Sequence, residues 1–514
     1  MPDAVDKVTR KIQAELAKRQ GPVSKDQSTV PIADGMRAYW ERDMLTFGIP
    51  AHAGGRGPAP EFVHWAGEDA ARSDLPMSHG VDTRNRVWQV QATAQELFAE
   101  AVGAKQTLFS TNGSSMSVRV AIMTVAGPGD TLVMARNGHK SSFAGLVLSG
   151  ARPVYLDPYY DEELELALGP LPDELTSTLA AHPEARAALV FTPSYYGTSA
   201  DVEALAEVCH GRDLPLVTVD AWGLDYSLGG HPDLPDAALI QGSDLAIGSV
   251  HKTLSGPGQT SVLSVGSDRI DTERLGLCFE LGESTSASTL LLSSIDGARR
   301  QFVREGRELL DRAVTSARLL RDRLATEVPE LRVVSTEQLS ARPGVAAVDP
   351  THVMIETASI GLTGHAADDW LRDERQIDVE LVDHRRIMPL ISFAHGEAEI
   401  DRLVTGLRDL VRAEGKPGSG TGVRPLPTRS ELRTEQAILP RDAFFADADM
   451  VHPRKAIGRI SAEMVTPYPP GIPAIAPGEG YTEAIVDYLE QVVAADGFVE
   501  GATDSSLSKL RVVV

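Results

Sequence analysis

The sequence predicts an α/β protein with a mainly parallel, seven-stranded sheet, a smaller α/β domain and a small C-terminal domain. Between about residues 90 and 270, short runs rich in Val, Ile and Leu alternate with segments whose apolar residues recur at helical spacing. Such alternation requires crossover connections, which give parallel strands buried on both faces. The seven runs are residues 107–110, 131–134, 153–156, 188–191, 216–219, 245–247 and 261–265.

The length of 514 residues exceeds the size at which one hydrophobic core stops growing, so we expect several domains. A long helical pattern begins at about residue 298, and a stretch rich in Gly and Pro at 415–429 indicates a linker. The predicted parts are an N-terminal helical or extended segment, a large domain, a smaller α/β domain, a linker and a C-terminal domain, over residues 1–60, 61–297, 298–412, 413–430 and 431–514.

Composition and charge argue against a secreted, membrane-spanning or nucleic-acid-binding protein. The first 20 residues lack the apolar centre of a secretion signal, and no apolar run reaches the ~18 residues that a membrane span needs. A net charge of −23 disfavours binding to nucleic acid. Cys209 and Cys278 form no CxxC pair, so neither a thiolate metal site nor a disulfide framework is expected. We therefore expect a cytoplasmic protein without a metal.

The first candidate site follows the strand predicted at 107–110. Asn112, Gly113, Ser114 and Ser115 stand where a helix is expected to begin. Backbone N–H groups, hydroxyls and the positive end of a helix dipole can bind an anion such as a phosphate. The same residue types are also ordinary helix caps, so this segment by itself leaves both interpretations open.

Two further candidates follow the strands at 131–134 and 216–219. His139 can lie flat against an aromatic cofactor, although a single histidine is more often structural. Asp220 ends a buried strand, where a carboxylate needs a cation or a set of donors. A protonated pyridine nitrogen would be such a partner, and a helix-capping role is the alternative.

The fourth candidate, Ser249, His251 and Lys252, follows the strand at 245–247. A lysine at this position can form an imine with an aldehyde cofactor, whereas most lysines are simply surface residues. The carboxyl ends of parallel strands meet at one edge of a sheet. We therefore expect anion donors, an imidazole, a carboxylate and a lysine to converge at that edge.

These segments resemble the Orn/Lys/Arg decarboxylases, a family of enzymes of fold type I that depend on pyridoxal 5'-phosphate (PLP), in the short form without an N-terminal wing domain. The resemblance runs from about residue 50 to the C-terminus. Its motifs are NGSS, RNGHKSS, TPSYYG, AWG, GSD followed by SVHK, LLLSSIDGARR and PYPPGIPAIAPGE, of which the last is the most specific. The resemblance implies decarboxylation of arginine, lysine or ornithine to a polyamine-type amine and carbon dioxide.

The resemblance also implies roles for individual residues. Lys252, rather than Lys140, would hold PLP as a Schiff base, and Lys252 or His251 would return a proton to the α-carbon. His139 would stack on the pyridine ring. The other implied cofactor-binding residues are Ser114, Ser115, Asp220, Trp222, Ser249 and His251, together with Thr285 and Ser286, which would reach the phosphate bound by the partner subunit. A homodimer or larger homo-oligomer with shared active sites is therefore expected.

The sequence departs from the family pattern at the carboxylate. Alignment on Pro215 and Gly223 puts Val219 where the family has Asp, with Asp220 one position later. Because strand side chains alternate between faces, we expect the strand to slip or bulge so that Asp220 reaches the pyridine nitrogen. The alternative is a nitrogen without a carboxylate, which would make the cofactor a weaker electron sink.

Three functions are open at this point. A decarboxylase of a basic amino acid is favoured. The alternatives are another PLP reaction on such a substrate (oxidative deamination, transamination or a specialised biosynthetic step) and a catalytically impaired paralogue. A distal ammonium or guanidinium would have to meet an acidic group. Sequence spacing does not name that group.

Overall fold

The computed structural model describes residues 26–77, 81, 89–419, 431–468, 471–494 and 497–514. The helical pattern expected in the first 20 residues lies outside this part of the chain, and so does most of the expected linker. Among the described helices, none is both long enough and apolar enough to cross a membrane.

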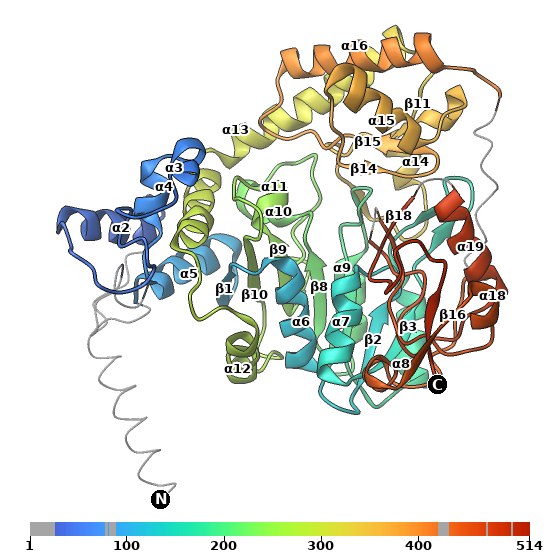
Figure 1. Ribbon diagram of the computed structural model, residues 1–514, viewed down its shortest axis with the longest axis horizontal. Coiled ribbons are helices and arrows are strands. Elements are labelled where there is room, and N and C mark those ends of the chain that lie inside the picture. The colour runs from blue at the N-terminus through green and yellow to red at the C-terminus, as the bar shows by residue number, and fades with distance from the viewer. Residues whose placement is uncertain (1–25, 78–80, 82–88, 420–430, 469–470, 495–496) are drawn as a thin grey trace, which may run out of the picture.

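A seven-stranded sheet forms the centre of the molecule (Figure 1). Strand β10 runs antiparallel to both of its neighbours, and the other pairs in the sheet are parallel. The seven strands predicted from the sequence are thereby confirmed. In their order across the sheet they are β1 (Gln106–Ser110), β10 (Ser261–Val265), β9 (Leu245–Ser249), β8 (Leu216–Asp220), β6 (Ala185–Phe191), β2 (Thr131–Ala135) and β3 (Arg152–Leu156).

Helices cover both faces of this sheet. Right-handed crossovers place α6 (Gly113–Val125) and α7 (Lys140–Ser149) on one face, with α12 (Thr272–Gly282) packed beside α6. The same rule places α8 (Pro172–Ala181), α9 (Val202–His210) and α10 (Leu224–Gly229) on the other face. Every residue of β2, β8, β9 and β10 is buried, which explains their unbroken apolar runs.

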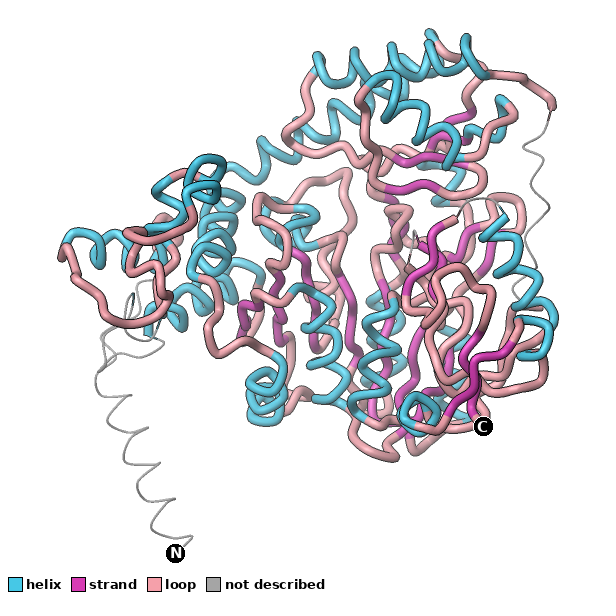
Figure 2. Tube along the Cα trace, viewed as in Figure 1, coloured by secondary structure: helices cyan, strands magenta, loops and turns pink. Residues whose placement is uncertain are grey.

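The N-terminal helices form an arm that projects from the large domain (Figures 1 and 2). The arm consists of α2 (Pro31–Glu41), α3 (Pro60–Ala66) and α4 (Glu68–Ser73), while α5 (Gln89–Val102) packs against β1. At its base lies a buried ion pair between Arg299 and Asp296, with a separation of 2.8 Å. Arg299 also donates to the carbonyl of Gln27 at 3.0 Å, and Asp296 accepts from the N–H of Ile32 at 3.2 Å. These contacts fix the start of the arm to the large domain.

One long helix, α13 (Thr289–Glu327), joins the large and small domains. It begins nine residues before the expected start at 298, because Leu292 and Ile295 continue the buried stripe at helical spacing. Its first half packs in a core with Phe302, and its second half packs in another with Leu320. A single rigid element therefore crosses the expected boundary at 297/298, and the boundaries of the domains stay a prediction.

The small domain contains a four-stranded antiparallel sheet, and the C-terminal region contains two strand pairs (Figure 2). The small sheet has the order β11 (Arg332–Val333), β13 (Ile355–Glu356), β15 (Arg386–Met388) and β14 (Leu381–Val382), with α14 (Thr336–Ser340), α15 (Gly364–Arg375) and α16 (Glu397–Glu414). The C-terminal elements are α17 (Pro440–Phe445), β16 (Ala448–Val451), α18 (Pro453–Ala456), β17 (Thr466–Tyr468), α19 (Glu483–Ala494), β18 (Phe498–Glu500) and β19 (Leu510–Val513).

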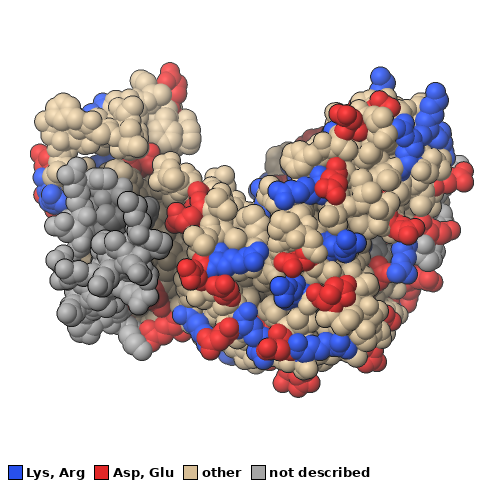
Figure 3. Space-filling view, turned by 90° about the horizontal axis from the view of Figure 1, so that it is seen from below, with Lys and Arg blue, Asp and Glu red and all other residues tan. Residues whose placement is uncertain are grey.

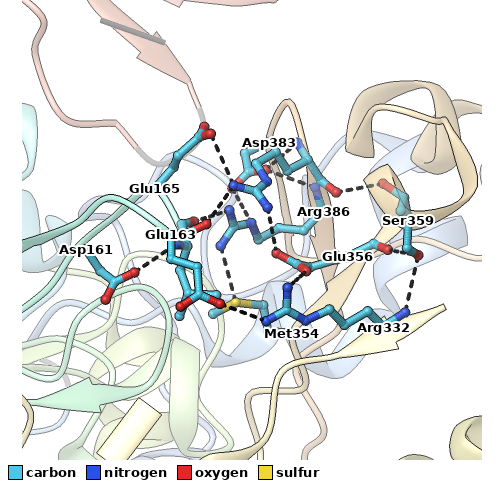
Figure 4. A network of polar contacts seen from close by, with 12 residues as sticks. Asp161, Glu163, Glu165, Arg332, Met354, Glu356, Ser359, Asp383 and Arg386 are labelled. Carbon is cyan, nitrogen blue, oxygen red and sulfur yellow. Dashed lines mark hydrogen bonds and ion pairs between the residues drawn. The ribbon is translucent and has the colours of Figure 1, made fainter. Parts of the chain in front are cut away.

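A polar network holds the small domain against a hairpin of the large domain, formed by β4 (Tyr160–Asp161) and β5 (Leu166–Ala167) (Figure 4). The fully buried Arg386 pairs with Asp383 at 3.1 Å and donates to the carbonyl of Leu164. A buried guanidinium is tolerated here because the carboxylate of Asp383 balances its charge. The contacts fix the small domain next to the carboxyl edge of the large sheet, where the reactive residues were expected.

Candidate active site

A cavity of about 330 Å³ opens at the edge where β1, β2, β6, β8 and β9 end. Its walls come from the segments that follow these strands, with one contribution from the C-terminal region. The residues that line it include Asn112, Gly113, Ser114, Ser115, Val118, Asn137, His139, Ser141, Phe191, Pro193, Tyr195, Tyr196, Val219, Ala221, Trp222, His251, Lys252, Gln259 and Ile472. The convergence predicted from the strand order is thus found at the expected edge.

The N-terminus of α6 supplies an anion site at one end of the cavity. Gly113 has a φ of +76°, which lets the chain turn from β1 directly into the helix, and its N–H donates to the carbonyl of Gln259 at 2.7 Å. Ser114 and Ser115 line the cavity from the first turn. Within the described residues, no hydrogen bond occupies either hydroxyl. Free N–H groups, two hydroxyls and the helix dipole together suit a phosphate.

Two neutral histidines stand in the cavity. His139 caps α7, and its Nδ1 accepts from the N–H of Ser141 at 3.2 Å. Burial, and then the nearby charge of Lys252, lowers the pKa of His139 to about 4. His251 donates from Nδ1 to the carbonyl of Thr260 at 2.9 Å, and burial lowers its pKa as well. The Nε2 atom of neutral His251 is therefore unprotonated and can accept a proton.

Lys252 lies in α11 (Val250–Thr253), a short helix that follows β9 directly. Its Nζ is 4.1 Å from the centre of the Trp222 ring. Burial lowers the pKa of Lys252 to about 8, and the negative charge of Glu380 opposes that shift. With such a pKa, roughly one amine in ten is unprotonated at pH 7, against roughly one in 3,000 for an ordinary lysine. Lys252 is thus suited to attack an aldehyde.

Several buried polar atoms at the cavity lack a partner within the described residues. Trp222 Nε1 and Asn137 Oδ1 belong to lining residues, and Ser249 Oγ is buried just behind them at the end of β9. Buried polar groups without partners are rare in native proteins, so these atoms indicate a ligand. Anion donors, a reactive amine and a flat imidazole in one cavity fit the phosphate, aldehyde and ring of PLP.

The structure brings six of the ten predicted site residues to the cavity wall: Ser114, Ser115, His139, Trp222, His251 and Lys252. Thr285 and Ser286 are exposed in the loop after α12, outside this chain's own cavity. That loop is tied to the end of β1, since Thr111 donates to Glu283 from its N–H at 3.1 Å and from its hydroxyl at 2.9 Å. The roles assigned to these residues stay predictions.

The slip or bulge expected in β8 is wrong. The strand keeps regular parallel register on both sides, pairing Val219 with Phe191 and with Ile247, and Asp220 with Gly248. Because side chains alternate along a regular strand, Val219 lines the cavity and Asp220 does not. Asp220 is instead buried on the opposite face of the sheet, where burial raises its pKa well above the usual value.

Sequence reasoning missed two polar residues near Lys252. Gln259 stands before β10, and it reaches the cavity because β10 is antiparallel, so that its start lies where the other strands end. A turn signal, Gly256-Pro257-Gly258, marks this start, but the strand's direction has to be known first. Glu380 comes from the small domain, whose docking no local pattern in the sequence encodes.

A second cleft of about 550 Å³ adjoins the first, and Lys252 lines both. Its outer wall belongs to the small domain and carries Asp378, Glu380 and Glu399. Asp378 pairs with Arg372 at 2.5 Å, and Glu399 accepts from a backbone N–H at the start of α16. Within the described residues, no hydrogen bond or ion pair ties down Glu380. Glu380 is therefore the acid available to a cationic ligand near Lys252.

Residues 471–479, which belong to the motif PYPPGIPAIAPGE, reach the cavity through a buried anchor. Arg136 donates to both carboxylate oxygens of Glu479, at 3.0 and 2.9 Å, and to the carbonyl of Pro473 at 2.8 Å. Its guanidinium also lies 4.8 Å from the ring centre of Phe143. This bidentate, fully buried pair fixes the C-terminal segment so that Ile472 closes one side of the cavity.

Comparison with known proteins agrees with this geometry. The family model for "Orn/Lys/Arg decarboxylase, major domain" matches residues 30–399, and that for the C-terminal domain of the same family matches residues 430–501. The arginine decarboxylase of Bacillus subtilis (strain 168) is 35% identical over 490 residues, which cover 95% of this chain and 98% of that protein. The arginine decarboxylase of Halalkalibacterium halodurans is 35% identical over 496 residues, again covering 95% and 98%.

Among solved structures, the constitutive lysine decarboxylase of Escherichia coli has a TM-score of 0.78 at 21% identity, covering 95% of this chain and 82% of that one. Fold and site together define a PLP-dependent enzyme of fold type I. The chain belongs to the Orn/Lys/Arg decarboxylase family. It is a PLP-dependent amino-acid decarboxylase, as the motifs in the sequence predicted.

Proposed function

We propose that the substrate of this decarboxylase is arginine, which it converts to the corresponding amine and carbon dioxide. The observation that carries this proposal is the position of Lys252, whose amine borders both the cofactor cavity and the cleft that contains Glu380. Relatives of 32–35% identity are named arginine decarboxylase, which supports the same substrate.

The residues of the first cavity bind and orient the cofactor. Ser114, Ser115 and the N-terminus of α6 would hold its phosphate, and neutral His139 would pack against its ring. The Nε1–H of Trp222 is a further donor, since it has no acceptor among the described residues. When bound, PLP supplies an electron sink for the pair of electrons left when carbon dioxide departs.

Lys252 and His251 move the protons. Lys252 is the amine that would hold the cofactor, and the same side chain can carry a proton. Its pKa of about 8 lets it serve as an acid or a base near neutral pH. His251 is fixed by its bond to Thr260 and presents Nε2. These two side chains are the groups placed to return a proton to the α-carbon.

Glu380 binds the far end of the substrate. A guanidinium presents two parallel N–H donors to a carboxylate, and such a bidentate pair gives both orientation and affinity. Because Glu380 lies on the small domain and Lys252 on the large one, the substrate spans the two domains.

The test is turnover by the purified holoenzyme with arginine, lysine and ornithine supplied separately. We expect carbon dioxide and amine in equal amounts, with the highest kcat/KM for arginine, and no turnover by Lys252→Ala. Keto acid formation or oxygen consumption in place of carbon dioxide would identify another PLP reaction. A preference for lysine or ornithine would overturn the assignment of the substrate.

We further propose that the enzyme is a cytosolic homodimer with shared active sites. Phe47, Ile49 and Trp65 on the arm are exposed by 95%, 73% and 73%. Figure 3 shows a hollow between the arm and the body of the molecule. Exposed apolar side chains of this kind mark a surface that another chain can cover. The positions of Thr285 and Ser286 support the same proposal, because both are exposed and neither is among the described residues that line the cofactor cavity of their own chain.

A further inference from the structure

The cofactor cavity has an apolar wall at the end of β8. Val219 lines the cavity there, followed by Ala221 and Trp222. The regular pairing of Val219 with Phe191 and Ile247 leaves no bulge that could exchange it for its neighbour. The identity of the side chain that β8 presents to the cofactor is therefore fixed by the strand's alternation.

The nearest carboxyl along this strand, that of Asp220, does not line the cavity. Asp220 is buried, and along β8 it alternates with Val219 and Ala221, which do line the cavity. Burial raises the pKa of Asp220 well above its usual value, and the neighbouring Asp225 raises it further. Because Asp220 does not line the cavity, its carboxyl is not placed to pair with a ligand there.

Within the described residues, no carboxylate lines the cofactor cavity. Its titratable lining residues are His139, His251, Lys252, Tyr195 and Tyr196, and the charge of Arg119 acts on His139 from nearby. Glu380 belongs to the adjoining cleft. The titratable residues that line the cofactor cavity are thus neutral or positive, and none of them stabilises a positive charge on a bound ring.

In PLP enzymes an acidic partner at the pyridine nitrogen tunes the electronics of the cofactor. We propose that this enzyme holds the pyridine nitrogen of PLP unprotonated, and that Val219 is the residue responsible. An unprotonated ring withdraws electrons less strongly, so negative charge stays nearer the α-carbon. Protonation at the α-carbon, which completes decarboxylation, is favoured over protonation at the cofactor carbon, which leads to transamination. Val219 thereby determines reaction specificity at some cost in rate.

The claim about reaction specificity rests on the proposed decarboxylation. The claim about the protonation state of the pyridine nitrogen does not depend on it. The first measurement therefore uses the full-length holoenzyme without substrate. PLP labelled with ¹⁵N in the ring is bound, and its ¹⁵N chemical shift is recorded by solid-state NMR at pH 7.5. We expect the shift of an unprotonated pyridine. A pyridinium shift in the unmodified enzyme would overturn the proposal, whatever its substrate is.

Two variants at one position give matched controls. Val219→Asp adds a carboxylate to the wall and should move the ¹⁵N signal to the pyridinium position, whereas the uncharged Val219→Asn should leave it as in the parent. With arginine, Val219→Asp should also divert a larger fraction of turnovers to transamination. If Val219→Asp fails to bind the cofactor, the ¹⁵N chemical shift of the parent enzyme still shows whether the pyridine nitrogen is protonated. A pyridinium signal that disappears in Asp220→Asn would assign the nitrogen to Asp220 instead.

Discussion

The amine of Lys252 is held where two opposing influences set its protonation. Burial disfavours the ammonium form and lowers the pKa to about 8, while the Glu380 carboxylate favours the charged form. The face of Trp222, 4.1 Å away, also favours a cation. The balance keeps both forms of the amine available near neutral pH. A group that must attack an aldehyde and later return a proton needs both.

Glu380→Gln is the substitution that tests how the substrate is bound. It removes one charge-assisted, bidentate contact to the guanidinium, and we expect KM for arginine to rise about 10- to 100-fold with a smaller change in kcat. It also removes the anion that supports the ammonium form of Lys252, so the pKa of Lys252 should fall further. Steady-state kinetics from pH 6 to pH 9 measure both effects.

The matched control for this experiment is Glu374→Gln, the same change at an exposed position of α15. It should leave KM and the pH profile unchanged. An unchanged KM in Glu380→Gln would show that the guanidinium is bound elsewhere. An equal rise in both variants would point to the net charge of the protein rather than to a contact.

At the scale of elements, the sheet was predictable because its strands are short, apolar and buried on both faces. The same reasoning located Ser114, His139 and Lys252, since parallel strands end at one edge. It failed at β8, where a shift of one residue decides which side chain meets the ligand. From the sequence we expected a slip or bulge that would turn Asp220 toward the pyridine nitrogen. Both flanking strands instead pair with β8 in regular register.

Site residues that do not follow the parallel strands could not be predicted in this way. Gln259 reaches the cavity because β10 reverses direction, and Ile472 because a buried Arg136–Glu479 pair holds a segment more than 300 positions away. Glu380 depends on how the small domain docks, through contacts such as that of Arg386 with Leu164. Such contacts join residues that are remote in sequence, so local periodicity carries no signal for them.

Asp220→Asn tests the buried face of β8. Because burial raises the pKa of Asp220, the folded protein keeps a proton that the unfolded chain releases above pH ~4. Above that pH the folded protein binds more protons than the unfolded chain, so Asp220 destabilises the folded protein increasingly as pH rises. An Asn side chain does not titrate, so it contributes no such dependence on pH. The stability of Asp220→Asn relative to the parent should therefore increase between pH 5 and pH 8, by at most about 1.4 kcal/mol per pH unit.

Thermal unfolding of both proteins at pH 5, 6.5 and 8 measures this trend. The exposed Asp373→Asn on α15 is the control, and its midpoint should follow that of the parent at every pH. A midpoint of Asp220→Asn that falls relative to the parent as pH rises would mean that Asp220 is ionised and has a buried partner.

At the scale of the whole molecule, the arm and the body enclose a hollow (Figure 3), and the arm's exposed apolar residues face solvent in a single chain. Apolar surface of this kind is costly unless another chain covers it. The loop with Thr285 and Ser286 is fixed to the end of β1, close in the chain to the anion site. A second copy would therefore cover the arm and complete the active site together.

Phe47→Ser tests this assembly, because Phe47 is 95% exposed and its side chain contributes little to the fold of one chain. We expect light scattering to show a shift from dimer to monomer at low micromolar concentration, with loss of turnover and unchanged secondary structure by circular dichroism. Val514→Ser, at another exposed apolar residue, should remain dimeric. A parent enzyme that is an active monomer would contradict the proposed assembly.

The most direct test of the account is to find which lysine carries the cofactor. Borohydride reduction of the holoenzyme makes the link permanent, and peptide mass spectrometry locates it. We expect the phosphopyridoxyl group on Lys252, since Lys140 is paired as a cation with Glu500 across the C-terminal region. A label on Lys140, or cofactor that dialyses away after reduction, would contradict the assignment of the active site.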